Sequence, residues 1–252
     1  MDLQLTGKRA IVTGASRGIG KAIARALAEE GVDLVVVART AGPLQAAAQE
    51  LSTATGRRVV AVVGDTGDDA SVAAFVAAAV DALGGVDILV NNAAVPGGAA
   101  PAGRLAEVRG AALLADVNTK VMGYLRTAQA VAPHLVAAGW GRIINIGGLA
   151  ARSSGHYVAS IRNGAVSALT KNLADEFGPK GVTAITIHPG GTRTEKTTPE
   201  QAQRIGQSSS IGRIVDAEEI AWLVTVLASP RSGAINGETI AAGGGTPKVI
   251  NY

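Results

Sequence analysis

Cysteine is absent from this chain of 252 residues, and aromatic residues make up only 3% of it. The lack of cysteine excludes disulfides, thiolate chemistry and cysteine-based metal sites, so we expect no metal and a reducing, cytoplasmic location. The formal net charge is only +3 and Lys and Arg form no run, which argues against nucleic acid as a partner. No apolar run approaches the roughly 20 residues that cross a bilayer, and no apolar leader opens the chain, so we expect no membrane partner.

Apolar residues make up 47% of the chain, and glycine is abundant. Short apolar stretches alternate with stretches of helical spacing, which predicts a doubly wound (Rossmann-type) α/β fold: a mostly parallel seven-stranded sheet with helices on both faces. We expect a single domain over residues 1–252, with a loop at 96–103 and a polar substrate flap at about 190–212. Strands are predicted at 8–12, 32–38, 57–63, 86–90, 141–146, 182–188 and 238–241, and helices at 21–30, 44–51, 72–83, about 113–138, up to 177, and 217–227.

A glycine-rich turn, Thr13-Gly14-Ala15-Ser16-Arg17-Gly18-Ile19-Gly20, lies between the first predicted strand and the first predicted helix. Glycine there permits backbone angles closed to other residues and lets a phosphate approach the helix closely. The unpaired N–H groups and the dipole at the helix start favour an anion. A plain tight turn is the alternative. The stretch predicts a nucleotide site at Gly14, Ser16, Arg17, Gly18, Ile19 and Gly20.

The Gly-x-x-x-Gly-x-Gly spacing after Thr13 resembles the short-chain dehydrogenase/reductase family. Asn91-Asn92-Ala93-Ala94 resembles the family's Asn-Asn-Ala-Gly, and the segment from Pro189 to Thr194 resembles the Pro-Gly-x-x-x-Thr that holds the nicotinamide amide. The resemblance implies a dinucleotide-binding oxidoreductase that transfers hydride between NAD(P)(H) and a carbonyl or alcohol group of a small molecule. It implies further cofactor contacts at Asp65, Thr66, Asn91, Ala93, Asn163, Pro189, Gly190, Thr192 and Thr194.

Arg39 follows the second predicted strand directly, after Ala38. In dinucleotide folds this strand end meets the adenosine ribose, where an acidic residue binds a free 2′-hydroxyl and an arginine suits a 2′-phosphate. Arg39, with Arg17 as a second cation, therefore favours NADP(H), with NAD(H) as the second choice. Either arginine is alternatively a solvated surface residue. Asp65 is either an adenine contact or a cap for the helix that follows.

The resemblance fails at the expected catalytic centre. In the family, catalysis rests on Asn, Ser, Tyr and Lys, with the Lys four residues after the Tyr on one helix face. Asn118 matches the Asn, with a helix-bending polar residue as the alternative. The position of the catalytic Ser is Gly148, at the end of Asn145-Ile146-Gly147-Gly148.

Two registers compete for the position of the catalytic tyrosine. Tyr157-Val158-Ala159-Ser160 resembles the family's Tyr-x-Ala-Ser, but the residue expected to be lysine is Ile161. Counting back from Leu169-Thr170-Lys171, which resembles the family's Leu-Thr-Arg, puts the tyrosine position at Ala159 and the lysine position at Asn163. A slip of two residues turns a helix face by about 200°. We therefore follow the helix register, which replaces Ser, Tyr and Lys by Gly148, Ala159 and Asn163.

Two functional hypotheses follow from this mismatch. The first is an NADP(H)-dependent oxidoreductase with a substitute acid, which is Tyr157, His156 or a group on the substrate. The second is a catalytically impaired NADP(H)-binding sensor or partner subunit on the same scaffold. Tyr157 and His156 are alternatively loop residues that pack the helix start.

The substrate and the assembly are less defined by the sequence. Polar residues in the flap, such as Gln201 and Arg204, favour a polar small-molecule substrate. Small residues such as Ala165 and Ala168 on the long helices allow close contact across a two-fold axis. The resemblance implies the same pairing, so we expect a homotetramer or a homodimer.

Overall fold

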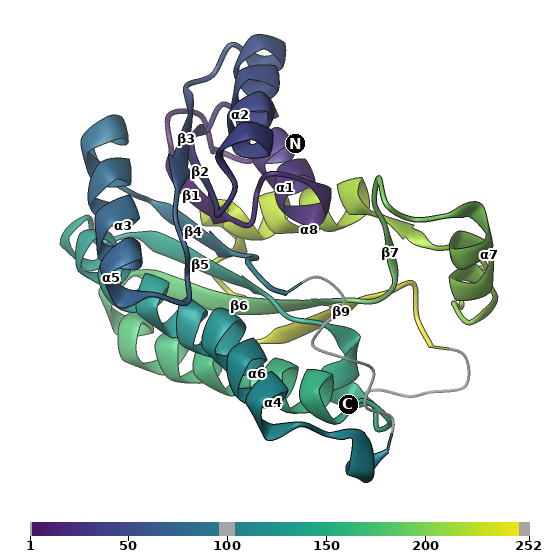
Figure 1. Cartoon of the computed structure of the whole chain (residues 1–252). Coiled ribbons are helices and arrows are strands. Elements are labelled where there is room, and N and C mark those ends of the chain that lie inside the picture. Colours follow the sequence, from purple (N-terminus) through teal and green to yellow (C-terminus); the bar gives the residue numbers. More distant parts are fainter. Residues whose placement is uncertain (1, 96–103, 247–252) are drawn as a thin grey trace.

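The computed structural model describes residues 2–95 and 104–246, and seven parallel strands form its main sheet in the order β3-β2-β1-β4-β5-β6-β9 (Figure 1). The order reverses beside β1, as in a doubly wound fold. The predicted fold class is therefore confirmed, and every pairing in this sheet is parallel rather than mostly so. The strands are β1 (Arg9–Thr13), β2 (Asp33–Ala38), β3 (Val59–Val63), β4 (Ile88–Asn91), β5 (Gly141–Ile146), β6 (Val182–Pro189) and β9 (Thr239–Ala242).

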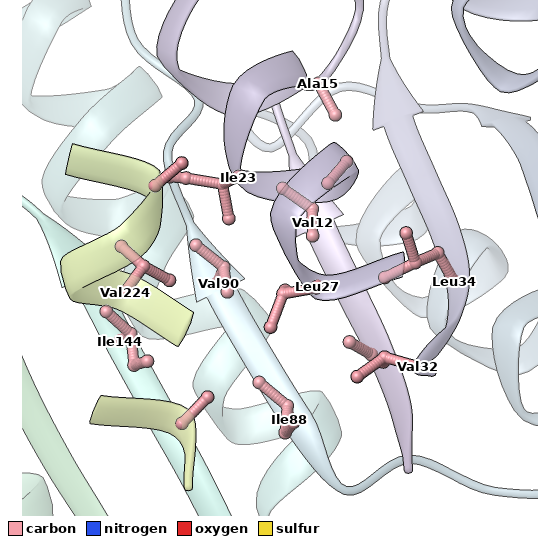
Figure 2. Close-up of a cluster of buried hydrophobic side chains, with 14 of the residues drawn as sticks. Val12, Ala15, Ile23, Leu27, Val32, Leu34, Ile88, Val90, Ile144 and Val224 are labelled. Atoms are coloured by element: carbon pink, nitrogen blue, oxygen red, sulfur yellow. The ribbon is translucent and has the colours of Figure 1, made fainter. Parts of the chain in front are cut away.

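Helices cover both faces of the sheet (Figure 1). On one face Val12, Ile88 and Val90 pack against Ile23, Leu27 and Val224 of the covering helices (Figure 2). Ile11 and Leu89 point to the other face, since side chains alternate along a strand. The first face carries α1 (Gly18–Glu29), α2 (Ala41–Thr55) and α8 (Ala217–Ala228), and the second carries α3 (Asp69–Leu83), α5 (Gly123–Ala137) and α6 (Tyr157–Phe177).

The helix predicted at about 113–138 is wrong as a single element. The chain instead forms α4 (Gly110–Val117), a π-helical turn η2 (Asn118–Met122) and then α5. A π turn inserts extra backbone into a helix without changing its apolar period elsewhere, so the sequence pattern hides it. The helix predicted at 44–51 also runs longer, from Ala41 to Thr55, because Pro43 is tolerated in a first turn.

The flap predicted at 190–212 contains β7 (Thr192–Arg193) and α7 (Pro199–Gln207), and Figure 1 shows α7 projecting away from the sheet. β7 pairs in parallel with β8 (Val215–Asp216), a two-residue ladder too short to predict from alternation. Short helical turns complete the fold at η1 (Leu105–Glu107), η3 (Leu149–Arg152), η4 (Gly178–Lys180) and η5 (Pro230–Ser232). The predicted loop at 96–103 lies outside the described residues.

Across residues 2–95 and 104–246, none of the helices combines the length and the apolar character needed to cross a bilayer.

Candidate active site

A cleft of about 460 Å³ opens at the carboxyl ends of β1, β2, β3 and β4. Parallel strands bring their carboxyl ends to one edge of the sheet, so segments distant in sequence meet there. The cleft gathers residues from the glycine turn, from the ends of three further strands and from the flap. Of the predicted cofactor residues, Gly14, Ser16, Arg17, Gly18, Ile19, Gly20, Arg39, Asp65, Thr66, Ala93 and Thr194 line it.

The glycine turn has no room for side chains at two of its positions. A Cβ on Gly20 would lie 2.3 Å from the carbonyl oxygen of Gly14, and a Cβ on Gly14 would lie 2.9 Å from Nδ2 of Asn92. Gly14 and Gly18 also have positive φ angles of 67° and 56°, which favour glycine. At its glycine positions the turn is therefore a cradle of bare backbone.

Asn92, just after the neighbouring strand β4, and Thr13, at the end of β1, together hold this cradle in place. Asn92 donates from Nδ2 to the carbonyl oxygens of Thr13 and Gly14, at 3.1 Å each. The Thr13 hydroxyl accepts the backbone N–H groups of Asn92 at 3.0 Å and Ala93 at 3.1 Å. The Asn-Asn-Ala-Ala segment thus braces the turn as well as lining the cleft.

A carboxylate oxygen already occupies the anion position at the start of α1. The backbone N–H of Gly18 donates to Oε2 of Glu195, a flap residue, at 3.2 Å. An unpaired helix N–H and the positive end of the helix dipole attract an anion, so this oxygen stands in for a phosphate oxygen. The cradle and its N–H group therefore fit a dinucleotide pyrophosphate.

Arginine and aspartate side chains also line the cleft. Arg17 and Arg39 are exposed along its rim, where a 2′-phosphate would find both cations. Asp68, not Asp65, caps α3, accepting the Ser71 N–H at 2.7 Å. Asp65 lines the cleft while its Oδ1 accepts the N–H of Gly67 at 2.9 Å.

Five predicted cofactor residues do not line this cleft. Asn91 is fully buried, donating to Oδ1 of Asn145 at 2.9 Å and accepting the Thr127 hydroxyl at 2.7 Å. Its amide therefore braces β4, β5 and α5 from beneath the cleft floor. The other four lie further along the sheet edge, on α6, at the end of β6 and on β7; they are Asn163, Pro189, Gly190 and Thr192.

Gly148 and Asn163 face one another at the end of β5. A Cβ on Gly148 would lie 2.8 Å from Nδ2 of Asn163, whose side chain is 2% exposed. Oδ1 of Asn163 is buried and has no hydrogen-bond partner among the described residues. Ala159 lies one turn before Asn163 on the same helix face. The positions that the resemblance assigns to Ser, Tyr and Lys thus converge here.

Tyr157 lies at the solvent side of this helix start. It is the first residue of α6 and is 41% exposed. Two residues of helix place it about 200° around the axis from Ala159. Ile161, one turn later, is 51% exposed on the same side.

Asn118 begins the π turn, and its amide bonds to groups outside β5 and α6. Its Nδ2 donates to the carbonyl oxygen of Gly67 at 3.1 Å, and its Oδ1 accepts Nη2 of Arg126 at 3.0 Å. Asn118 therefore ties the helix bend to the β3–α3 loop and to α5, and its neighbour Thr119 lines the dinucleotide cleft.

Sequence reasoning missed a buried lysine beside the positions that the resemblance assigns to Ser and Lys. Lys120 is 3% exposed, and its Nζ donates to the carbonyl oxygen of Gly147 at 2.8 Å. Burial is the main cause that lowers the pKa of Lys120 to about 7; Arg162 adds to the shift, and Asp116 opposes it. Arg162 donates from Nη1 to both oxygens of Asp116, at 2.6 and 2.7 Å. The available signal was a lysine inside a helix predicted to be packed.

His188 was also missed, although it directly precedes the Pro189-Gly190 pair. Its Nδ1 accepts the backbone N–H of Gly148 at 2.8 Å, and its Nε2 lies 3.0 Å from the Ser167 hydroxyl. Burial, with smaller contributions from Lys120 and Arg152, lowers the pKa of His188 to about 4, so the ring is neutral. His188 therefore fixes the backbone of Gly148 as a neutral acceptor.

The reversed strand order and the bare glycine turn at its edge define a Rossmann-type dinucleotide-binding fold. The short chain dehydrogenase family model matches residues 8–205, and the chain belongs to that family.

Relatives and solved structures match the chain over nearly all of its length. The short-chain reductase protein NovJ of Streptomyces niveus is 38% identical over 94% of this chain and 93% of its own. The 3-oxoacyl-[acyl-carrier-protein] reductase FabG of Vibrio cholerae is 34% identical, covering 96% and 98%. L-sorbose reductase of Gluconobacter frateurii, solved with NADPH and L-sorbose, is 29% identical and superposes with a TM-score of 0.91, covering 99% and 100%.

Proposed function

We propose that this protein is an NADP(H)-dependent oxidoreductase acting on a carbonyl or alcohol group of a small, polar molecule. The observation that carries the proposal is the cleft, which joins a side-chain-free glycine cradle, two arginines and the flap residue Thr194. Relatives over nearly the full length of the chain are named reductases, and a structural neighbour was solved with NADPH. When bound, the nicotinamide supplies or accepts the hydride.

The two arginines support a preference for NADPH over NADH. Arg39 and Arg17 flank the cleft, and the position before Arg39 is Ala38, which offers no carboxylate to a free 2′-hydroxyl. A charge-assisted contact between guanidinium and phosphate is among the strong hydrogen bonds in proteins. We expect NADPH to bind at least tenfold more tightly than NADH, a difference of about 1.4 kcal/mol.

The test combines cofactor titration with a turnover screen. Nicotinamide fluorescence gives the Kd values of NADPH and NADH at matched salt, and absorbance follows NADPH oxidation against a panel of polar ketones and aldehydes. Tight NADPH binding with turnover of at least one carbonyl supports the proposal. Tight binding without any turnover, in either direction, would favour the sensor or partner-subunit hypothesis instead.

We also propose that the protein assembles as a homotetramer or homodimer. Leu114 on α4 is 70% exposed and Ile161 on α6 is 51% exposed, near the small residues of α6. Apolar side chains of this size on one pair of helices suit a two-fold helix contact. Light scattering at micromolar protein concentration checks this, and a monomeric mass would contradict it.

A further inference from the structure

Resting on the proposed oxidoreductase function, we infer that Lys120 is the cation of the catalytic centre, entering from the π turn η2 to replace the lysine absent at Asn163. This centre lies where η2, the end of β5 and α6 meet. Three observations support the assignment of Lys120.

The first observation is the position of the ammonium group. Nζ of Lys120 lies 2.8 Å from the carbonyl oxygen of Gly147, and the residue is 3% exposed. Asn163 of α6 lies against the next residue, Gly148: a Cβ on Gly148 would be 2.8 Å from Nδ2 of Asn163. The ammonium and the amide thus converge on one dipeptide from opposite helices.

The second observation is the unused bonding capacity on both sides of this dipeptide. Oδ1 of Asn163 is buried without a hydrogen-bond partner among the described residues. An ammonium group has three N–H donors, and the described residues accept one of them from Lys120, at Gly147. Buried polar groups are normally paired, so unused donors and an unused acceptor together indicate space for a polar guest. Because Gly148 has no side chain, the Asn163 amide lies close to it: a Cβ there would be 2.8 Å from Nδ2.

The third observation is the orientation of the π turn. Asn118, its first residue, is held outward by Gly67 and Arg126, whereas Lys120 points inward to Gly147. π turns recur at functional sites because they re-aim side chains within a helix. Here the turn brings an ammonium inward and sends an amide outward, while α6 carries an amide at the position expected for lysine.

The charged groups around Lys120 leave its charge uncancelled. Asp116 on α4 is fully buried and already paired through both oxygens with Arg162 of α6. His188 on β6 is neutral, with Nδ1 accepting the Gly148 N–H. The pKa of about 7 for Lys120 follows from burial and from Arg162. Near neutral pH the group is therefore able to give or take a proton.

The chemistry assigned to Lys120 is proton supply during carbonyl reduction. The carbonyl carbon gains a hydride and forms a C–H bond, and the electron pair of the C=O π bond moves to oxygen. That oxygen takes a proton from the Lys120 ammonium, leaving a neutral amine that regains a proton from water. Alcohol oxidation runs the same transfers in reverse, with the neutral amine as base.

The activity test uses Lys120→Met with Lys171→Met as matched control, because Lys171 is 61% exposed on α6. With a carbonyl found in the turnover screen, Lys120→Met is expected to lower kcat/KM at least about 100-fold at pH 6.5. Lys171→Met should stay within threefold. In the wild type, kcat for reduction should fall above pH 7 as the ammonium is lost. A Lys120→Met variant within threefold of wild type, or with an unchanged pH profile, overturns the inference.

A charge-exchange variant separates a catalytic charge from a purely structural contact. The double variant Lys120→Asn with Asn163→Lys restores the ammonium to the α6 position and the amide to η2. If a positive charge is required at this centre, the double variant should be at least tenfold more active than Lys120→Asn alone. No recovery in a double variant that melts within a few degrees of wild type contradicts the inference.

A measurement without turnover keeps this inference distinct from the proposed function. NMR of lysine labelled with ¹³C at Cε should show one signal titrating near pH 7 that is absent from Lys120→Met. NADP⁺ at saturation should move that midpoint. A shifted midpoint with no turnover of any carbonyl supports the charged centre and refutes the oxidoreductase proposal. A midpoint unmoved by NADP⁺ overturns the inference even if turnover is found.

Discussion

The two halves of the sheet edge build their sites from different parts of the chain. In the cofactor half, at the ends of β1 to β4, the pyrophosphate cradle is backbone: glycines without side chains and the N–H at the start of α1, braced by the Asn92 amide. In the proposed catalytic half, at β5, η2 and α6, side chains meet instead: Lys120, Asn163 and His188 reach the Gly147–Gly148 dipeptide from three elements. Backbone requirements fix glycine spacing in the sequence. A side-chain function can instead move from one helix to another.

The largest expected effect is that of Gly20→Ala, which disrupts the glycine cradle of the cofactor half. In Gly20→Ala the new Cβ would lie 2.3 Å from the Gly14 carbonyl oxygen, so the turn must shift. We expect a loss of about 3 kcal/mol in unfolding free energy and at least a 100-fold weaker NADPH Kd. Denaturant unfolding and fluorescence titration measure both.

Gly42→Ala is the matched control for that change. Gly42 lies in α2, has a negative φ, and a Cβ added to it would have no heavy atom within 4 Å. The substitution should leave binding unchanged and add up to about 1 kcal/mol of stability. Equal effects of the two substitutions would contradict the claim that the cradle requires a residue without a side chain at Gly20.

The second effect tests the catalytic half through stability alone. The pKa of Lys120 is about 7 when folded, against about 10.4 when unfolded, so between these values the unfolded chain binds more protons. The unfolding free energy of the wild type should therefore rise with pH over this window, by about 2 to 4 kcal/mol relative to Lys120→Met. Urea unfolding of both proteins at pH 7, 8.5 and 10 checks this. If the unfolding free energies of the two proteins changed in parallel with pH, the pKa of Lys120 would not be lowered in the folded protein.

The third effect concerns recognition of the 2′-phosphate by Arg39 in the cofactor half. Arg39→Ala should weaken NADPH binding about tenfold, or 1.4 kcal/mol, and leave the NADH Kd within twofold. Arg58→Ala, another exposed arginine near the end of the β2–β3 connection, serves as control. If Arg39→Ala weakens both cofactors equally, the arginine contributes general attraction rather than 2′-phosphate recognition.

The smallest effect concerns the flap residue that occupies the anion position. Glu195→Gln removes the carboxylate charge that accepts the Gly18 N–H and lies where a phosphate would bind. NADPH should bind about threefold to fivefold more tightly, consistent with up to about 1 kcal/mol at a helix start. Glu176→Gln, at an exposed position of α6, makes the same charge change elsewhere. Weaker NADPH binding by Glu195→Gln would show that Glu195 assists the cofactor rather than competing with it.

The same contrast explains how much was predictable from the sequence. Alternating apolar runs indicated the class of sheet, and the glycine spacing located the cleft, because both follow from backbone geometry. The π turn was hidden, since apolar spacing continues on either side of it, and with it the inward direction of Lys120. His188 and Gly147 fit together only in three dimensions: a Cβ on Gly147 would lie 2.0 Å from the imidazole. β7 and β8 are too short for any alternation to indicate.

The most direct test of the central claim, that the charge of the centre has moved to Lys120, is single-turnover hydride transfer from NADPH. Wild type, Lys120→Met and Tyr157→Phe are compared at pH 6.5 with the same carbonyl. Lys120 is buried at the Gly147–Gly148 backbone, whereas Tyr157 is 41% exposed, so we expect the far larger loss for Lys120→Met, at least about 100-fold. A larger loss for Tyr157→Phe than for Lys120→Met would contradict it.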